Sequence, residues 1–263
     1  MKRAAIIWML ATAILCGVGP AGGPRTGALV VAGGGDLPEA IVKKFIELAG
    51  GVDSPVVVIP TAGESAGYSA GWKGADFLRK AGCKQVTVLH TQSRTEADSL
   101  PFVAPLRKAK GVWFPGGRQW RLVDSYLHTR TQRELEKVLE RGGVIGGTSA
   151  GATIQGSYLV RGAREGNTVM MAPGYEAGFG YLRNVAVDQH LIKRRREKDL
   201  EAVIVAHPEL LGIGIDEGTA IIVQGDVLEV MGASKVAIYE AGKPYYFLPA
   251  LERFDLRTRQ RVR

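Results

Sequence analysis

A serine flanked by glycines is the residue of this chain best suited to nucleophilic chemistry. It stands in Gly147-Thr148-Ser149-Ala150-Gly151, directly after the apolar pair Val144-Ile145. A buried strand that runs through such a G-x-S-x-G turn into a helix is a nucleophile elbow, in which small neighbours let strand and helix pass closely. The alternative is a tight glycine turn in which the serine only caps a helix. The partners found elsewhere in the chain favour the elbow.

A serine nucleophile needs a base, and His190 is the best candidate. It ends the motif Asp188-Gln189-His190 after the apolar residues 185–187, so we expect it at the end of a strand. His90 also ends a strand-like run and is the second choice. His128 and His207 lie in helical patterns and are not expected to serve as the base.

The adjacent carboxylates Asp216 and Glu217 are the candidates for the acid that orients the base. They interrupt an apolar strand pattern, between Gly214-Ile215 and Gly218-Thr219. Two carboxylates there are costly to bury without partners. One of them is therefore expected to point into a site, with a plain turn at a strand end as the alternative.

Backbone N–H groups and arginines complete the candidate site. Gly116 and Gly117 follow a strand pattern at 112–114, where backbone without side chains can present N–H groups to an oxyanion, with the N–H of Ala150 as second donor. The run Lys193-Arg194-Arg195-Arg196 begins shortly after His190. Such a run is typically a solvated helix face, but one or two of its arginines in the crevice would bind a carboxylate of the substrate.

The elements that must position these residues follow an alternating pattern. Apolar, β-rich runs predict strands at 28–32, 55–59, 85–89, 111–114 and 143–145, and helical spacing predicts helices at 37–48, 70–81 and 131–139. This alternation predicts a parallel sheet covered by helices on both faces, with the site at the carboxyl ends of the strands. Gly33-Gly34-Gly35 ends the first strand, but it lacks the spacing and the lysine of a phosphate loop.

The last third of the chain has a different pattern. Gly225-Asp226 separates two β-rich runs and predicts a hairpin, and further strands are expected at 235–239 and 245–248. We therefore expect antiparallel strands to be added to the sheet, within one domain at 26–263.

Composition excludes several classes of protein. The 263 residues carry a formal net charge of +8, with 34 Lys and Arg against 26 Asp and Glu, and no basic run is interleaved with stacking aromatics. Nucleic acid is therefore not an expected partner. Two cysteines cannot build a disulfide framework, and no Cys/His cluster has the spacing of a metal site. We expect no metal and no cofactor.

The first residues are typical of a secretory signal. Lys2-Arg3 precedes an apolar stretch at 4–18, which residues 21–24 interrupt. We expect residues 1–25 to be cleaved, giving an exported periplasmic or secreted protein with no stable membrane span. A retained anchor is the alternative, although the stretch is short of the roughly 20 residues that a span needs. Cys16 follows Ile14-Leu15 and so fits a lipoprotein site poorly.

Taken together, the motifs resemble those of the cyanophycinase-like serine peptidases, relatives of the aspartyl dipeptidase (peptidase E) family. The resemblance covers roughly residues 28–240, most of the mature chain. Four segments carry it in the same order and spacing: Phe114-Pro115-Gly116-Gly117-Arg118-Gln119, Gly147-Thr148-Ser149-Ala150-Gly151-Ala152, Asp188-Gln189-His190 with its arginines, and Gly212-Ile213-Gly214-Ile215-Asp216-Glu217-Gly218-Thr219.

The resemblance implies a flavodoxin-like three-layer α/β fold with a mostly parallel sheet, related to class I glutamine amidotransferases. It implies Ser149 as nucleophile, His190 as base and Glu217, rather than Asp216, as acid. It further implies a pocket for a peptide or small molecule with an acidic group. The oligomeric state stays open, with a homodimer as one alternative. The residues implied for that pocket are Gln119, Asp188, Gln189, Arg194 and Arg196.

Two positions depart from the family pattern, and two other classes of protein remain as alternatives. Arg118 replaces an acid, and Asp199 stands near a position where the family has a further arginine. Both changes alter the pocket charge and put cleavage of the β-aspartyl-arginine polymer in doubt. A non-catalytic binding protein would keep the pocket without needing Ser149, His190 and Glu217 together. An α/β-hydrolase esterase shares the elbow, but its acid precedes its histidine in the chain.

Overall fold

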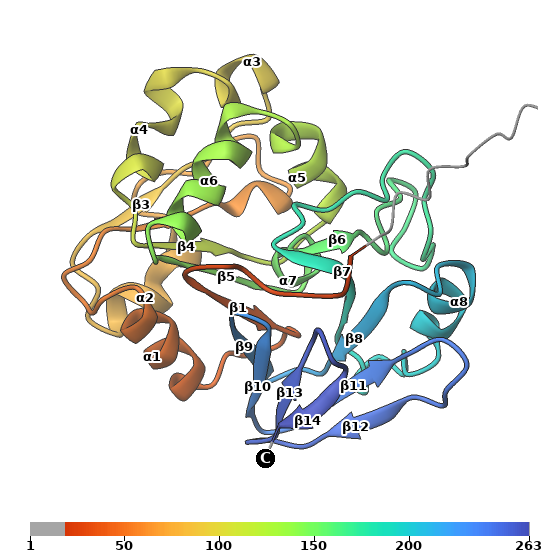
Figure 1. Ribbon diagram of the computed structural model, residues 1–263. Helices are drawn as coiled ribbons and strands as arrows, with labels where there is room; N and C mark the ends of the chain where they lie inside the picture. Colours follow the sequence, from red (N-terminus) through yellow and green to blue (C-terminus); the bar gives the residue numbers. More distant parts are fainter. Residues whose placement is uncertain (1–18, 263) are drawn as a thin grey trace, which may run out of the picture.

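Two sheets form the framework of the protein in the computed structural model, which describes residues 19–262 (Figure 1). The larger, nine-stranded sheet has the order β14-β13-β10-β9-β1-β5-β4-β2-β3. Its strands are β1 (Ala28–Ala32), β2 (Val56–Val58), β3 (Val86–Val88), β4 (Gly111–Phe114), β5 (Val144–Thr148), β9 (Thr219–Gln224), β10 (Val227–Gly232), β13 (Arg253–Asp255) and β14 (Gln260–Val262). The smaller, five-stranded sheet contains β12 (Tyr246–Leu248), β11 (Val236–Tyr239), β8 (Leu211–Ile215), β7 (Leu182–Gln189) and β6 (Gly156–Tyr158), in that order.

Helices connect the strands of the larger sheet, and α7 (Ala150–Thr153) leads from this sheet to the smaller one. The connecting helices are α1 (Glu39–Leu48), α2 (Asp76–Lys80), α3 (Arg94–Ala97), α4 (Leu100–Lys108), α5 (Gln119–Tyr126) and α6 (Arg130–Glu140), with the short 3-10 helices η1 (Pro60–Ala62) and η2 (Lys73–Ala75). The last helix, α8 (Asp199–Ala206), lies between β7 and β8 in the chain. Within residues 19–262 no helix is both long and apolar enough to cross a bilayer.

The predicted α/β architecture is confirmed. Strands β1, β5, β4, β2 and β3 are parallel, and the unbroken apolar sequences of β1, β2 and β4 are typical of strands buried on both faces. The predicted C-terminal hairpin is β9 and β10, joined by Gly225-Asp226, and it adds antiparallel strands beside β1. The helix predicted at 70–81 is shorter, because it divides into η2 and α2.

A second sheet was not predicted. The strands at 235–239 and 245–248 were expected beside the first sheet, but they pair with each other in a separate sheet, which continues from β11 through β8 to β7. The physical reason is that β7 is apolar on both faces. Val185 and Val187 face the larger sheet, whereas Ala186 packs on the opposite side with Leu200 and Val203 of α8. The spacing of apolar residues predicts a buried strand but not its pairing partner.

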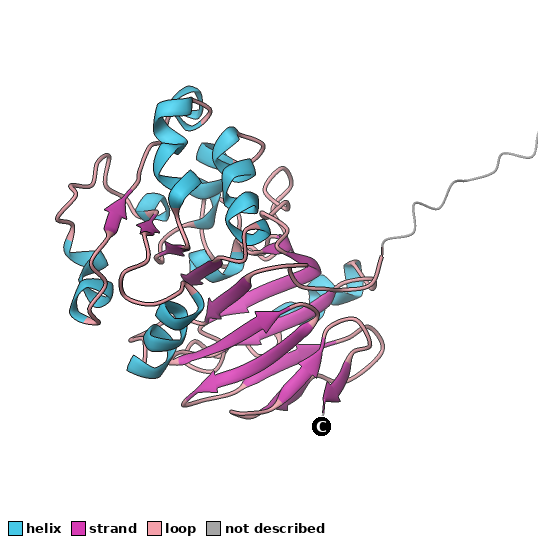
Figure 2. Ribbon diagram, turned by 60° about the vertical axis from the view of Figure 1, so that its left-hand side comes forward, coloured by secondary structure: helices cyan, strands magenta, loops and turns pink. Residues whose placement is uncertain are grey.

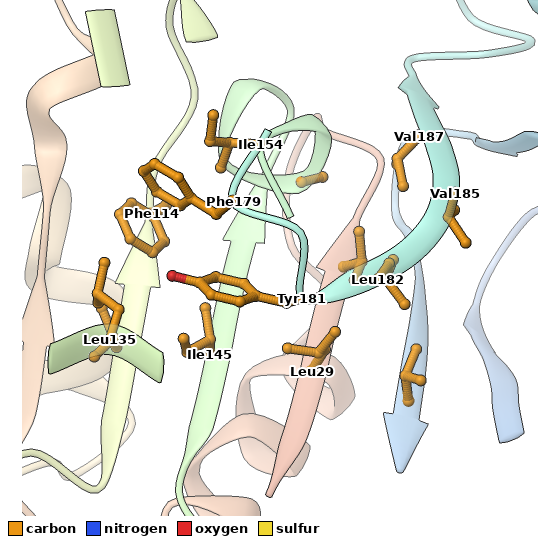
Figure 3. Close-up of a cluster of buried hydrophobic side chains, with 14 of the residues drawn as sticks. Leu29, Phe114, Leu135, Ile145, Ile154, Phe179, Tyr181, Leu182, Val185 and Val187 are labelled. Atoms are coloured by element: carbon orange, nitrogen blue, oxygen red, sulfur yellow. The ribbon is translucent and has the colours of Figure 1, made fainter. Parts of the chain in front are cut away.

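The helices and sheets pack in layers (Figure 2). These layers enclose three apolar clusters. Helices α1 and α2 cover one face of the larger sheet, where Phe45 packs edge-to-face on Trp113 with ring centroids 5.0 Å apart. On the other face, Leu29 and Ile145 of the larger sheet belong to one apolar cluster with Leu182 and Val187 of the smaller one (Figure 3). Full burial of one such side chain is worth about 1.5–3 kcal/mol, so this cluster holds the two sheets against each other.

The chain before β1 is also part of the fold. Residues 1–18 of the expected signal segment lie outside the described residues, but 21–24 are buried. Gly22 exchanges two backbone hydrogen bonds with Arg183 of β7, at 3.1 and 2.8 Å. Cleavage after residue 25, where the expected signal segment ends, would remove this contact.

Candidate active site

Ser149 occupies a sharp turn between β5 and α7, with φ 56° and ψ −114°. Its N–H donates to the carbonyl of Ala32 at 3.0 Å, which fixes the turn against β1. The small neighbours are necessary here. A Cβ on Gly147 would lie 2.3 Å from the carbonyl oxygen of Gly151, and one on Gly151 would lie 2.0 Å from that of Phe114. The turn therefore has the strained, closely packed geometry of a nucleophile elbow.

His190 and Glu217 lie in line with this serine. The Nε2 atom of His190 is 2.9 Å from Oγ of Ser149, and its Nδ1 atom is 2.5 Å from Oε1 of Glu217. His190 follows the end of β7 with φ 55°, and its N–H donates to the carbonyl of Gly33 at 2.9 Å. Glu217 follows the end of β8. The smaller sheet thus presents both groups to a serine of the larger sheet.

Gly34 and Gly35 form the wall behind these two side chains. A Cβ on Gly34 would lie 2.2 Å from Cε1 of His190, and one on Gly35 would lie 2.8 Å from Oε2 of Glu217. Sequence reasoning missed this role, although three consecutive glycines at a strand end were a usable signal. The glycines make room for the histidine and the carboxylate.

Asp216 has a different task from its neighbour Glu217. Its Oδ1 accepts the backbone N–H groups of Ile192 and Lys193, both at 3.0 Å, and its Oδ2 accepts the hydroxyl of Ser234 at 2.7 Å. Burial raises the pKa of Asp216, but these hydrogen bonds outweigh it and bring the pKa below its ordinary value. Asp216 therefore holds the loop after His190 in place.

The surroundings of His190 favour its neutral form. Burial lowers the pKa of the imidazole below its ordinary value, and the positive charges of Arg194 and Arg196 act in the same direction. The hydrogen bond to Glu217 opposes them without reversing the shift. At neutral pH the ring is therefore able to accept a proton through Nε2.

The expected oxyanion donors surround Ser149. A Cβ on Gly116 would lie 3.3 Å from Cβ of Ser149, so this backbone passes directly beside the serine. Gly117 has φ +146°, and a Cβ there would lie 2.1 Å from the carbonyl oxygen of Ala62. That carbonyl also accepts the N–H of Arg118 at 2.8 Å, which fixes the loop.

The five residues expected in the pocket differ in accessibility. Gln119 is buried and donates to the carbonyl of Val160 at 2.9 Å. Arg196 is buried and donates to the carbonyl and to Oε1 of Gln189, both at 3.2 Å. Arg194 is exposed.

Asp188 was expected to contact substrate, and in the structure its side chain contacts Arg161. The residue is fully buried, with 0% exposure, and both of its oxygens accept hydrogen bonds from Arg161 at 2.7 and 2.8 Å. Its Oδ1 also accepts the N–H of Gln189 at 2.9 Å. An internal guanidinium and a backbone N–H group thus bind this carboxylate.

Sequence reasoning did not single out Arg161. It is 1% exposed, has φ 57°, and donates to Asp199 at 2.5 Å and to the carbonyl of Asn167 at 2.7 Å. Asp199, which departs from the family pattern, thus pairs with a residue of this chain. The only signal was an arginine directly after the apolar pair Leu159-Val160.

The other histidines are engaged elsewhere. Nδ1 of His90, the second choice for the base, is 2.8 Å from Oγ1 of Thr61, and its ring packs on Tyr68. His207 packs on the ring of Tyr158. Within residues 19–262 no three His, Cys, Asp or Glu side chains are grouped as ligands of a metal ion.

A serine on an elbow, beside a buried histidine that a carboxylate contacts, is the arrangement of the serine hydrolases. The comparison with known families narrows this class. The sequence model of the family described as "Peptidase family S51" matches residues 29–231, and the chain belongs to that family of serine-type peptidases. Its α/β fold with added antiparallel strands is the class I glutamine amidotransferase-like fold of the family, as the resemblance implied.

Several relatives are named cyanophycinases. One from Geminocystis herdmanii is 31% identical over 221 residues, covering 82% of this chain and 81% of the relative. One from a Nostoc species is 32% identical over 226 residues, covering 82% of this chain and 74% of the relative. The resemblance to cyanophycinase-like peptidases is thereby confirmed.

Two solved structures are similar. A peptidase from an acI-B1 actinobacterium superposes with a TM-score of 0.70 at 27% identity, covering 89% of this chain and 98% of the other. A putative peptidase E from Listeria monocytogenes superposes with a TM-score of 0.56 at 19% identity, covering 80% and 100% of the two chains. The second of these likenesses concerns the fold alone.

Proposed function

We propose that this protein is an exported serine peptidase that hydrolyses an aspartyl-containing or isoaspartyl peptide bond. Ser149 is the nucleophile, His190 the general base and Glu217 the acid that orients the base. The observation that carries this proposal is the pair of contacts at His190, 2.9 Å to Ser149 and 2.5 Å to Glu217. Each ring nitrogen then has the partner that a triad requires.

In the acylation step, Oγ of Ser149 attacks the carbonyl carbon of the scissile bond while its proton passes to Nε2 of His190. The carbonyl oxygen becomes an oxyanion, which the N–H groups of Gly116 or Gly117 and of Ala150 stabilise. Collapse of this intermediate breaks the C–N bond. The proton on His190 goes to the departing amine, which leaves an ester on Ser149.

In the deacylation step, water takes the place of the amine. His190 accepts a proton from the water as its oxygen attacks the ester carbonyl, and returns it to Oγ of Ser149 when the C–O bond breaks. Glu217 keeps Nδ1 protonated and stabilises the imidazolium that forms in both steps. The low pKa of His190 suits this role, because the ring is neutral before each attack.

The charge of the site supports a substrate with an acidic group. Arg196 is a buried guanidinium beside Gln189, and Arg194 is exposed near His190. A carboxylate of an aspartyl residue would bind a guanidinium of this kind through charge-assisted hydrogen bonds. The names of the cyanophycinase relatives favour aspartyl chemistry, whereas Arg118 and Asp199 argue against assuming the same polymer.

Active-site labelling tests the chemistry directly. A fluorophosphonate probe should label the wild-type protein on Ser149 and should fail to label Ser149→Ala. A non-catalytic binding protein would not react. The unlabelled wild-type protein should then cleave isoaspartyl or aspartyl dipeptides, whereas cleavage only of simple esters would favour an esterase.

Export is supported by the sequence at residues 2–18. Fractionation of the producing cells should recover the protein outside the cytoplasm. Soluble cytoplasmic protein that retains Met1 would contradict this part of the proposal without affecting the chemistry.

A further inference from the structure

Two buried guanidinium groups near the end of β7 have different kinds of partner. Arg161 donates to both oxygens of Asp188 and to Asp199, at 2.7, 2.8 and 2.5 Å. Arg196 donates to the two carbonyl oxygens of Gln189. In the part of the chain from 19 to 262, no carboxylate oxygen lies within the 4.0 Å of an ion pair with Arg196.

The same two carboxylates are nevertheless within electrostatic reach of Arg196. Burial and the charge of Arg161 lower the pKa of Arg196, whereas Asp188 and Asp199 act in the opposite direction. Asp188 also directly precedes Gln189, which Arg196 contacts. The two carboxylates are kept from Arg196 by the planar fork of Arg161, which matches both oxygens of Asp188 and reaches Asp199 with the same Nη2 atom.

We propose that Arg161 determines specificity as the internal counterion of Asp188 and Asp199, and so leaves Arg196 free to bind a carboxylate of the substrate. This inference rests on the proposed function, in which Arg196 meets the acidic group of the substrate. Arg161 is a positioning residue, because it contacts the two carboxylates and acts on the substrate only through them.

Loss of Arg161 alone should prevent Arg196 from binding a carboxylate of the substrate. Asp188 is fully buried, so water cannot solvate the charge that Arg161→Met would leave there. Arg196 is within electrostatic reach of Asp188, and pairing with this carboxylate would occupy it. The charge of Asp199 costs less to leave without Arg161, because this side chain is 38% exposed and water can solvate it.

A second substitution should reopen the site. In Arg161→Met/Asp188→Asn, the buried charge and its partner are removed together, which is far less disruptive than removing one of them. The amide oxygen of the new side chain can still accept the N–H of Gln189, the contact that Oδ1 of Asp188 makes at 2.9 Å. Arg196 then has no buried carboxylate to pair with.

The test is calorimetric binding of succinate, with neutral succinamide as the reference probe, to the full chain carrying Ser149→Ala in every variant. Binding should weaken at least tenfold in Arg161→Met and return to within threefold of the parent in the double variant. Asp199→Asn, in which Arg161 still pairs with Asp188, is the matched control and should show no loss of succinate binding. Arg196→Met should abolish the preference for succinate over succinamide.

Several outcomes would overturn the inference. Unchanged succinate binding in Arg161→Met is one. A double variant that folds but binds as poorly as Arg196→Met is another, because it would give Arg161 only a structural role. The second result decides the matter even if Arg161→Met alone does not fold. Absence of succinate binding in the parent would also reject the inference, whereas fluorophosphonate labelling of Ser149 would still support the peptidase chemistry.

Discussion

A Cβ atom on Gly34 would lie 2.2 Å from Cε1 of His190, so the imidazole and the glycine backbone occupy adjoining space with no room for a methyl group. Gly34→Ala should therefore displace His190 and cut kcat by about 10²-fold, the loss associated with a misplacement near 1 Å. Kinetics of the purified variant measure this.

Gly51→Ala is the matched control for that experiment. Gly51 also has a positive φ, of +98°, but nothing lies within 4 Å of its Cβ position. Both variants carry backbone strain, and only Gly34→Ala adds a clash with the site. Equal losses of kcat in the two would mean that strain, and not the position of His190, limits turnover.

Ser149 and His190 should behave as one unit. Ser149→Ala should lower kcat by several orders of magnitude, about 10⁴- to 10⁶-fold as in other triads, because no other group supplies the nucleophile. His190→Ala should cost about as much, and the double variant little more. Single-turnover assays on all three variants measure the effect, and circular dichroism checks the fold. A loss of kcat in the double variant equal to the product of the two single losses would show that the residues act independently.

Substitution of Glu217 should lower activity, whereas substitution of its neighbour Asp216 should lower stability. Glu217→Gln removes the charge that orients His190, and kcat should fall by up to about 10⁴-fold with an unchanged melting temperature. Asp216→Ala removes the acceptor of two backbone N–H groups and should cost about 1.5–3 kcal/mol of stability. Thermal denaturation and kinetics of both variants give the comparison. A silent Glu217→Gln beside an inactive but stable Asp216→Ala would reverse the roles.

The pH profile should follow the pKa of His190. Because burial lowers that pKa, the acidic limb of kcat/KM should fall below the ordinary value near 6.5. The neutral base is lost only as pH drops through the lowered pKa, so activity should persist into mildly acidic solution. Arg194→Met removes a positive charge that favours the neutral ring, so it should move the acidic limb to higher pH.

Lys193→Met is the control for the pH experiment. It removes an equal charge from the adjacent residue, which is not among the groups that shift His190. The acidic limb of this variant should coincide with that of the wild type. An identical displacement in both variants would point to net charge and not to Arg194 itself.

The mature N-terminus should fall before Ala21. Residues 21–24 are buried, and Gly22 pairs with Arg183, so cleavage further along would remove part of the packing beside β7. N-terminal sequencing of exported protein should find a start between residues 17 and 21. A stable mature chain that starts at 26 would show that this contact is dispensable.

Local patterns predicted the strands that precede the site well. Val144-Ile145 and the glycines after it define the elbow, since an apolar strand and a turn without Cβ atoms are both readable from consecutive residues. The hairpin at Gly225 was readable for the same reason, because its φ of 57° requires a residue such as glycine.

Partners distant in the chain could not be read in this way. Arg161 and Asp188 are 27 residues apart, and each alone has an ordinary sequence context. The choice of Glu217 over Asp216 depended on resemblance, because the side chains of consecutive residues at a strand end point in different directions. The second sheet escaped prediction because pairing between strands is a property of the assembled chain.

The seam between the two sheets has a mechanical consequence. Ser149 belongs to β5 and α7 of one sheet, whereas His190 and Glu217 extend from β7 and β8 of the other. The apolar cluster that includes Ile145 and Val187 thus fixes the distance from Ser149 to His190. The rate of turnover therefore reports on the packing of the two sheets against each other. Mild pressure or denaturant that loosens the contact between the two sheets should abolish activity while the helices and strands are still intact.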